Sequence, residues 1–350
     1  MSPRNSIIMD KSKKVIVGIS IGDTNGIGIE IILKTFEDKR MLDFCTPVIF
    51  ASNKILATYK NKLKLNLPIQ TIHTIDKVIH GKINLFNVWN EETPLEVGQA
   101  TKTGGKYAFL SLKSAVSALK KGSIDVLVTA PINKSTIQSD EFTFPGHTEY
   151  LNQELDGDAL MILMTDKIRV ALLTGHIAID QVTANITPEL IHKKVNILYK
   201  TLKQDFSINK PKIAILSINP HVGDDGVIGT ADDKVLSPTV QAIQKEGKLV
   251  YGPYAADSFF GSGSYKNFDA ILAAYHDQGL TPFKTLSFGE GVNFTAGLDK
   301  IRTSPDHGTA FDIAGKGLAD ASSFKEALFS AIEIFKTRQQ NIELNKTSLK

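Results

Sequence analysis

Cysteine is almost absent from this sequence of 350 residues, which contains only Cys45. A single thiol cannot form an intrachain disulfide, so a disulfide-stabilised secreted scaffold is excluded and a reducing compartment fits. We interpret Cys45 as a small, half-buried hydrophobic residue rather than as a nucleophile.

The sequence also lacks a long hydrophobic run. Its most apolar stretch, residues 159–175, is interrupted by Asp166, Lys167 and Arg169, whereas a membrane span needs about 20 apolar residues. Residues 1–13 are polar and lack the apolar segment of a signal peptide, so we interpret them as a flexible leader. We therefore expect a soluble, cytoplasmic protein with no membrane partner.

Charge of one sign is not concentrated anywhere in the chain. The 40 basic and 37 acidic residues give a formal net charge of +3 and are dispersed, which argues against a nucleic-acid partner. A hydrophobic content of 42% and a charged content of 22% are ordinary for a globular protein. The length suits about two domains.

Short apolar runs alternate with longer segments of helical spacing. One apolar stripe recurs at helical spacing through residues 108–119 and ends before Gly122, and Thr187 followed by Pro188 is a typical helix start. Strands alternating with helices predict α/β layers around a largely parallel sheet. The predicted strands are 14–21, 47–51, 83–88, 124–130, 159–164, 169–174, 212–218 and 270–274.

Three histidines each follow a predicted strand: His176, His221 and His276. Ligands of open α/β sheets lie beyond the carboxyl ends of the strands. Three neutral imidazoles with an open position suit a catalytic divalent metal. Each histidine is equally compatible with a role as a polar loop residue. Three nearby acids could either orient metal ligands or be solvated loop residues: Asp224, Asp225 and Asp277.

No complete G-x-G-x-x-G motif is present, so the usual dinucleotide fingerprint is missing. The glycine-rich residues 20–30 follow the first strand and could approach a ligand, or simply form a turn. His147 and Thr148 precede a predicted helix, and Lys284, Asn293 and Arg302 occupy one loop-rich stretch. Such basic groups suit a phosphate or carboxylate, although scattered basic residues are usually solvated.

Five motifs, taken together, resemble one family: "PGHTE", "NPH", "YHDQGL", "FGEGVNFTAGL" and "IRTSPDHGTAFDIAG". They are similar to the 4-hydroxythreonine-4-phosphate dehydrogenase family of pyridoxal phosphate biosynthesis. The resemblance implies two α/β/α domains with a cleft between them, as in isocitrate and isopropylmalate dehydrogenases, and a homodimer. Expected boundaries are 14–140 plus 300–350 for an NAD-side domain, and 141–299 for a metal and dimer side.

The resemblance also implies the roles of individual residues. His176, His221 and His276 would bind one divalent metal (Zn, Mg, Mn or Co), the last of them coming from the partner subunit. "DHGTAFDIAGKG" would contribute NAD contacts from His307, Gly308 and Asp312. The first loop, "GDTNGIG", departs from the family's "GEPAGIG"-like form. The implied substrate contacts are His147, Thr148, Lys284, Asn293 and Arg302.

The implied reaction is the NAD-dependent oxidation of 4-phosphooxy-L-threonine at C3. Loss of carbon dioxide then gives 3-amino-2-oxopropyl phosphate. Candidates for the catalytic base are Asp257, Lys284 and His147. Two alternatives stay open: a dehydrogenase of 4-phospho-threonate or 4-phospho-erythronate, and a non-redox, metal-dependent hydrolase or binding protein for phosphorylated ligands.

Overall fold

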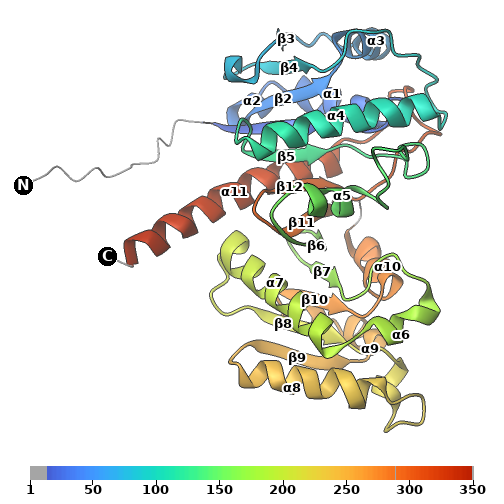
Figure 1. The fold of residues 1–350 in the computed structure, drawn as a ribbon, viewed down its shortest axis with the longest axis vertical. Helices are drawn as coiled ribbons and strands as arrows, with labels where there is room; N and C mark the ends of the chain where they lie inside the picture. Colours follow the sequence, from blue (N-terminus) through green and yellow to red (C-terminus); the bar gives the residue numbers. More distant parts are fainter. Residues whose placement is uncertain (1–13, 288, 349–350) are drawn as a thin grey trace, which may run out of the picture.

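The computed structural model describes residues 14–287 and 289–348, and the leader predicted for residues 1–13 lies outside them. The described chain forms one sheet in the order β3-β4-β2-β1-β5-β12-β11-β6-β7-β10-β8-β9. This sheet runs through the length of the molecule (Figure 1). The α/β class predicted from the sequence is therefore confirmed.

The outer parts of the sheet are parallel, as predicted, but its centre is antiparallel. Neighbours β12-β11-β6-β7 pair antiparallel, while β7, β10, β8 and β9 pair parallel, as do β3, β4, β2, β1, β5 and β12. The short connections at residues 165–168 and 299–301 explain the antiparallel pairs β6-β7 and β11-β12, because a tight turn can join only antiparallel neighbours.

Four strands were not among the predicted runs: β3, β9, β11 and β12. All eight predicted runs contain a strand. The strands are β1 (Val15–Ser20), β2 (Cys45–Ala51), β3 (Ile69–Ile72), β4 (Ile83–Asn87), β5 (Val126–Thr129), β6 (Gly157–Met164), β7 (Arg169–Leu172), β8 (Lys212–Leu216), β9 (Leu249–Tyr254), β10 (Ala270–Ala273), β11 (Val292–Leu298) and β12 (Arg302–Pro305).

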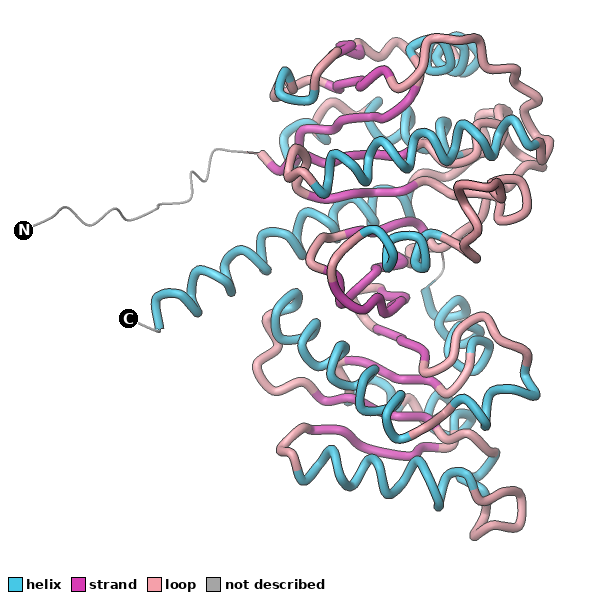
Figure 2. The backbone as a smooth tube through the Cα atoms, in the orientation of Figure 1, coloured by secondary structure: helices cyan, strands magenta, loops and turns pink. Residues whose placement is uncertain are grey.

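Helices cover both faces of the sheet (Figure 2). Thr187 accepts a hydrogen bond from the Leu190 amide at the start of α7, which confirms the predicted N-cap. The helices are α1 (Gly28–Glu37), α2 (Met41–Phe44), α3 (Asn53–Leu63), α4 (Lys102–Lys120), α5 (His147–Glu154), α6 (Val182–Asn185), α7 (Pro188–Phe206), α8 (Ser237–Lys245), α9 (Ala256–Gly261), α10 (His276–Ser287) and α11 (Ser322–Ser348).

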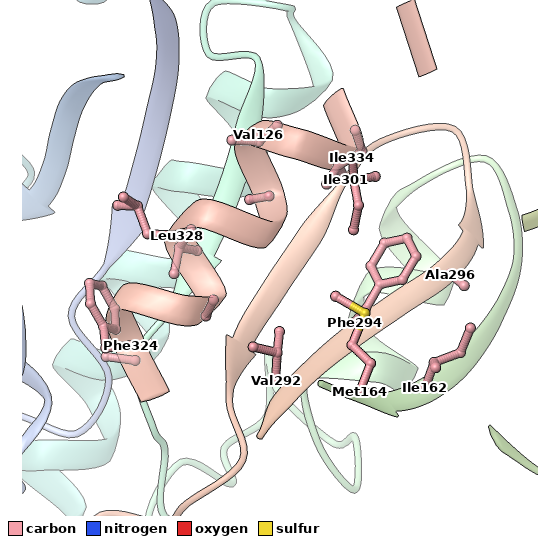
Figure 3. Packing of buried hydrophobic residues seen from close by; sticks show 14 of the residues in the cluster. Val126, Ile162, Met164, Val292, Phe294, Ala296, Ile301, Phe324, Leu328 and Ile334 are labelled. Carbon is pink, nitrogen blue, oxygen red and sulfur yellow. The ribbon is translucent and has the colours of Figure 1, made fainter. Parts of the chain in front are cut away.

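Each strand face has its own core. Val126 and Val128 of β5 are buried in one hydrophobic cluster, whereas Leu127 between them is buried in a second. Strands covered on both faces read as continuous apolar runs, which explains why they were visible in the sequence. Figure 3 shows α11 packed over the sheet, with Phe324 and Leu328 on the side away from β11 and Ile334 beside Ile301.

Within the described ranges, every helix is too short or too polar to cross a membrane. Cys45 is completely buried, more so than predicted, and burial raises the pKa of its thiol to about 12. The thiol is therefore protonated at neutral pH and is not a nucleophile. The boundaries of the two expected domains stay a prediction, since the sheet continues from one half into the other.

Candidate active site

A cavity of about 820 Å³ lies beside the centre of the sheet and is lined by residues from both halves of the chain. All five predicted substrate residues line it, together with His176 and His276 of the predicted metal set and His307 and Gly308 of the predicted cofactor loop. His221, Asp257 and Asp312 are not among the described residues that line it. The structure thus brings together residues between 147 and 308 that the sequence separates.

Arg302 supplies a buried positive charge to this cavity. The residue is 2% exposed at the start of β12. Its guanidinium donates three hydrogen bonds, two to Thr129 Oγ1 (3.0 and 2.6 Å) and one to Thr295 Oγ1 (3.1 Å). Burial lowers the pKa of Arg302 to about 9, so it is still protonated at pH 7. A guanidinium has five N–H donors, and two therefore remain for a ligand.

No carboxylate among the described residues forms an ion pair with Arg302. A buried cation without a counter-ion is costly, and an anionic ligand would relieve that cost. The planar guanidinium matches the oxygens of a phosphate or carboxylate. The environment of Arg302 therefore indicates an anion-binding site.

Three further polar atoms of cavity residues are buried without a hydrogen-bond partner: His147 Nε2, Asn293 Oδ1 and, described below, His307 Nε2. Burial, followed by the charges of Arg302 and Lys134, holds the pKa of His147 well below its ordinary value of 6.5. The imidazole is therefore neutral at pH 7. Because buried polar atoms are normally paired, these three atoms are candidates for contacts with a bound ligand.

The three strands that precede the predicted metal ligands are neighbours. β10 pairs in parallel with β7 on one side and with β8 on the other, so the carboxyl ends that lead to His176, His221 and His276 share one edge. The rings of His176 and His276 are close, with centroids 5.4 Å apart. Desolvation, followed by the charges of Lys134 and His276, lowers the pKa of His176, which favours the neutral form that binds metals.

Asp277 contacts the ring of His276, as expected if this acid orients a metal ligand. His276 Nδ1 lies 2.7 Å from Asp277 Oδ1. Engagement of Nδ1 leaves Nε2 for a metal, a common arrangement in metal sites. Asp224 and Asp225 are exposed in their loop, as solvated acids would be.

His221 lies in an unusual loop after β8. Residues 221–226 all have positive φ, beginning with His221 at 52° and Val222 at 60°. Left-handed backbone is unfavourable for residues other than glycine. Buried Asp232 supports the preceding segment by accepting hydrogen bonds from the Ile218 and Asn219 amides (2.7 and 3.0 Å). The His221 side chain itself is exposed.

Within one chain, the described residues contain no cluster of three or more histidines, cysteines or acids that could hold a metal ion. The resemblance assigned His276 to a partner subunit, whereas here His276 of the same chain is the one beside His176. A third ligand must come from elsewhere if the site is to be completed.

The predicted cofactor loop is held by α1 rather than by its own motif. Glu30, fully buried, accepts hydrogen bonds from the Gly315 amide (3.1 Å) and the Ala319 amide (3.0 Å). Lys34, one turn later, donates to the carbonyls of Gly317 (2.7 Å) and Ala319 (2.8 Å) and lies 3.1 Å from Glu30. The loop is thereby clamped to the helix.

His307 and Gly308 lie at the cavity end of this loop. His307 Nδ1 is 3.0 Å from the Gly308 carbonyl, and its Nε2 is buried without a partner. Asp312 is on the loop but outside the cavity lining. Of the three predicted cofactor contacts, the first two therefore border the substrate residues.

The three candidates named for the catalytic base differ in position, since His147 and Lys284 line the cavity and Asp257 does not. Lys284 lines the cavity, and its Nζ lies 3.5 Å from the Asp306 carbonyl. Asp257 is in the first turn of α9, where Ser258 Oγ is 3.3 Å from it, and it does not line the cavity. Burial raises the pKa of the Asp306 carboxyl, which also lines the cavity.

The first glycine loop has a structural role. At Gly22, φ is +69° and an added Cβ would lie 2.2 Å from the Pro131 carbonyl. Asp23 is fully buried and accepts hydrogen bonds from the Asn25 amide and Thr136 Oγ1. The loop therefore supports the segment after β5 and does not line the cavity.

Sequence reasoning missed six charged residues that line the cavity: Lys134, Glu149, Asp158, Lys193, Lys194 and Asp306. Lys134 is in the loop after β5, and its Nζ lies 3.4 Å from His176 Nε2. Glu149 is in the first turn of α5, two residues after His147. The signal for Glu149 was its place inside "PGHTE", and that for Lys134 was its place just after a predicted strand.

Comparison with known proteins places the chain in one family. The family described as pyridoxal phosphate biosynthetic protein PdxA matches residues 43–331. The 4-hydroxythreonine-4-phosphate dehydrogenase of Bacteroides thetaiotaomicron is 47% identical over 332 residues, which are 94% of this chain and 91% of that protein.

Solved structures show the same relationship. The crystal structure of 4-hydroxythreonine-4-phosphate dehydrogenase from Klebsiella pneumoniae superposes with a TM-score of 0.79 at 30% identity, covering 93% of this chain and 98% of that one. A terephthalate 1,2-cis-dihydrodiol dehydrogenase from Burkholderia xenovorans shares the fold, with a TM-score of 0.61 at 23% identity. The chain belongs to the PdxA family of pyridoxal phosphate biosynthetic proteins.

Proposed function

We propose that the protein is a metal-requiring, NAD-dependent dehydrogenase that oxidises C3 of 4-phosphooxy-L-threonine. Loss of carbon dioxide then gives 3-amino-2-oxopropyl phosphate, a step of pyridoxal phosphate biosynthesis. The observation that carries the proposal is Arg302, a buried cation with no ion pair among the described residues, in a cavity that also holds two neighbouring imidazoles. Two relatives, 47% and 40% identical to this chain, are named 4-hydroxythreonine-4-phosphate dehydrogenase.

In this proposal, Arg302 binds the phosphate through its two remaining N–H groups. Thr129 and Thr295 fix the guanidinium plane before the substrate arrives, so little conformational entropy is lost on binding. His147 Nε2 and Asn293 Oδ1 orient the polar groups of the carbon chain. Fixed groups of this kind favour the transition state if they match its charge distribution.

The residues fit a divalent metal in part. His176 and His276 lie side by side, and the environment of His176 favours its neutral form. We assign the third imidazole to a second copy in a homodimer. The resemblance implies that the partner supplies His276, whereas the 5.4 Å between the His176 and His276 rings of one chain supports His221 as the partner's contribution. Zn, Mg and Co all remain candidates. When bound, the metal supplies Lewis-acid assistance to loss of the hydroxyl proton and of carbon dioxide.

The residues also fit a nicotinamide cofactor next to the substrate. The clamped loop brings His307 and Gly308 to the cavity, and His307 Nε2 has no partner in the described chain. When bound, NAD supplies the hydride acceptor. Asp312 lies further along the same loop and would contact a more distant part of the cofactor.

Proton transfer is assigned to the candidates that line the cavity, Lys284 and His147. Neutral His147 can accept a proton at Nε2. Asp257 does not line the cavity of its own chain, so it could act only in the cavity of a second copy. A cytoplasmic setting is part of the proposal, since the buried single thiol of Cys45 needs no oxidising compartment.

The test is an NADH-formation assay on the purified protein with 4-phosphooxy-L-threonine and NAD, with and without a chelator. We expect activity that the chelator removes and added metal restores. His176→Ala and His276→Ala should abolish activity and metal content, while the matched control His73→Ala, an exposed histidine outside the cavity, should change neither. Full activity in chelator would refute the metal, and no NADH with metal present would refute the proposed reaction.

A further inference from the structure

Asn25 is a buried polar residue that the roles described above do not use. It is 0% exposed and belongs to the first glycine loop, at one of the positions where "GDTNGIG" departs from the family's "GEPAGIG"-like form. An alanine at this position would have no side-chain group to form a hydrogen bond. The side chain of Asn25 forms two, and both connect it to residues 96–101, the segment that leads into α4.

Three hydrogen bonds in all join Asn25 to residues 96–101. Asn25 Nδ2 donates to Thr101 Oγ1 (2.9 Å), and Oδ1 accepts from the Glu96 amide (2.9 Å). The backbone carbonyl of Asn25 accepts from the Gly98 amide (2.8 Å). The segment is neither helix nor strand, so its backbone groups need partners elsewhere in the chain. Asn25 therefore fixes the position of this segment.

Residues 96–101 in turn pack closely against the predicted cofactor loop. Gly98 has a φ of +90°, and a Cβ built there would lie 3.0 Å from the Phe311 carbonyl oxygen. A Cβ built at Gly315 would lie 2.7 Å from Val97 Cγ1. Because closely packed groups transmit a displacement to their neighbours, movement of this segment would move the cofactor loop.

The first glycine loop also contacts the cofactor loop directly. The Ile27 amide donates a hydrogen bond to the Thr309 carbonyl (3.0 Å), and a Cβ built at Gly26 would lie 2.9 Å from the same oxygen. Thr309 follows Gly308, which lines the cavity. Three separate parts of the chain thus meet in one loop junction, formed by residues 25–27, 96–101 and 309–315.

We propose that Asn25 is a positioning residue for the nicotinamide cofactor, acting through residues 96–101 to hold the loop of His307 and Gly308 in its binding conformation. The inference rests on the proposed function and adds to it a residue outside the cavity that sets the affinity for NAD. A loop held in one conformation before binding loses little entropy when the ligand arrives. If release of the loop leaves one tenth of the molecules competent to bind, the apparent Kd rises about tenfold.

NAD binding to Asn25→Ala tests the proposal, measured by calorimetry on the full-length protein with no substrate present. We expect the Kd for NAD to rise about tenfold and the Kd for inorganic phosphate, the proposed ligand of Arg302, to stay unchanged. Asn84→Ala is the matched control, since Asn84 is also 0% exposed and hydrogen-bonded through its side chain, but to residues 47, 79 and 82. It should melt at a lower temperature and bind NAD as the wild type does.

Gly98→Ala tests the loop junction from its other side and replaces Asn25→Ala if that variant does not fold. The added methyl group would press on the Phe311 carbonyl, so we again expect NAD to bind about tenfold more weakly. Gly81→Ala is its control. Gly81 has a similar φ of +73°, but a Cβ there meets nothing within 4 Å, so the backbone strain is matched without the contact. Thermal melting should show that each variant is folded.

Weaker NAD binding in the folded junction variants, with both controls unaffected, supports the inference. It is overturned if these variants bind NAD as tightly as the wild type, or if the controls lose the same affinity. A wild-type protein that binds NAD while the junction variants keep its affinity refutes this inference alone. A wild-type protein that binds no NAD refutes the cofactor of the proposed function itself.

Discussion

The surroundings of the Arg302 side chain suit the binding of a ligand better than they suit the stability of the fold. Its guanidinium is buried, and within the described residues its hydrogen bonds are to the hydroxyls of Thr129 and Thr295. Hydroxyls satisfy donors without neutralising charge. The free energy of burying the charge is therefore left for an anion to offset.

We predict that inorganic phosphate raises the melting temperature of the wild-type protein but not that of Arg302→Met. Ligand that binds only the folded state adds about 2.7 kcal/mol of stability at one hundred times Kd. Differential scanning calorimetry with and without phosphate checks this. Arg40→Met is the control, since Arg40 is exposed and paired with Asp38. Equal stabilisation of both variants by phosphate would place the anion elsewhere.

His147 has a pH-dependent effect on stability that follows from its lowered pKa. The folded-state pKa lies well below the ordinary 6.5, so the unfolded chain takes up a proton first as the pH falls. The free energy of unfolding is therefore undiminished above pH 6.5 and falls below it, by about 1.4 kcal/mol per pH unit, until the folded-state pKa is reached.

His147→Gln should remove this loss. We expect the difference in unfolding free energy between pH 7 and pH 5 to shrink by up to about 2 kcal/mol. Urea titrations at the two pH values measure it, with His73→Gln as the control at an exposed position. The same pH 5 to pH 7 difference in wild type and His147→Gln would show that His147 is not held neutral.

Among the helices, α1 has a second role besides covering the sheet. Glu30 and Lys34 lie one turn apart and together make four hydrogen bonds to the backbone of residues 315–319. Two charged side chains four residues apart are neighbours on one helix face, so both can form hydrogen bonds with the same loop. The loop that carries the proposed cofactor contacts thus depends on a helix some 280 residues earlier.

Glu30→Gln should loosen this loop. We expect the free energy of unfolding to fall by about 1–3 kcal/mol, the usual range for hydrogen bonds to a charged group. Hydrogen exchange followed by mass spectrometry should show faster exchange in residues 306–319. Glu37→Gln, at an exposed position of the same helix, is the matched control. Unchanged exchange in Glu30→Gln would mean that the loop is held by other contacts.

How well the elements could be predicted depended on their burial. The apolar runs became strands because both faces are covered, and the stripe of α4 is buried from Ala108 to Leu119. β9, β11 and β12 were missed since polar residues and prolines interrupt them, as in "RTSP". The antiparallel centre was missed because a strand's own pattern does not reveal the direction of its neighbour.

The assembly decides whether the three histidines can form one metal site. His176 and His276 meet within one chain, and His221 is on an exposed loop at the same edge. Apolar side chains are exposed near both positions: Ile179 (70%) after His176 and Val227 (84%) after His221. A second copy covering this edge would bury them as it completes the site.

Heterodimers purified with two different tags test this arrangement. If His221 comes from the second copy, a heterodimer of His176→Ala and His221→Ala has one site with both defects and one intact site. We expect about half of the wild-type activity per dimer, although each parent homodimer is inactive. A second heterodimer combines His176→Ala with His276→Ala. If the partner's residue is instead His276, this second heterodimer regains activity and the first does not. Two inactive heterodimers would exclude a shared site.

The linear chain was sufficient to determine the α/β class, most strands and the placement of three histidines after strands, because these depend on local periodicity and burial. Only the tertiary structure decided which side chains share a cavity. Thr129 and Arg302 are 173 residues apart, and Lys134 and His176 are 42 apart. The first pair meets because β5 pairs with β12, and the second because the sheet order β5-β12-β11-β6-β7 places both chain segments at the centre of the sheet. Strand order of this kind arises from packing and leaves no mark in residue spacing.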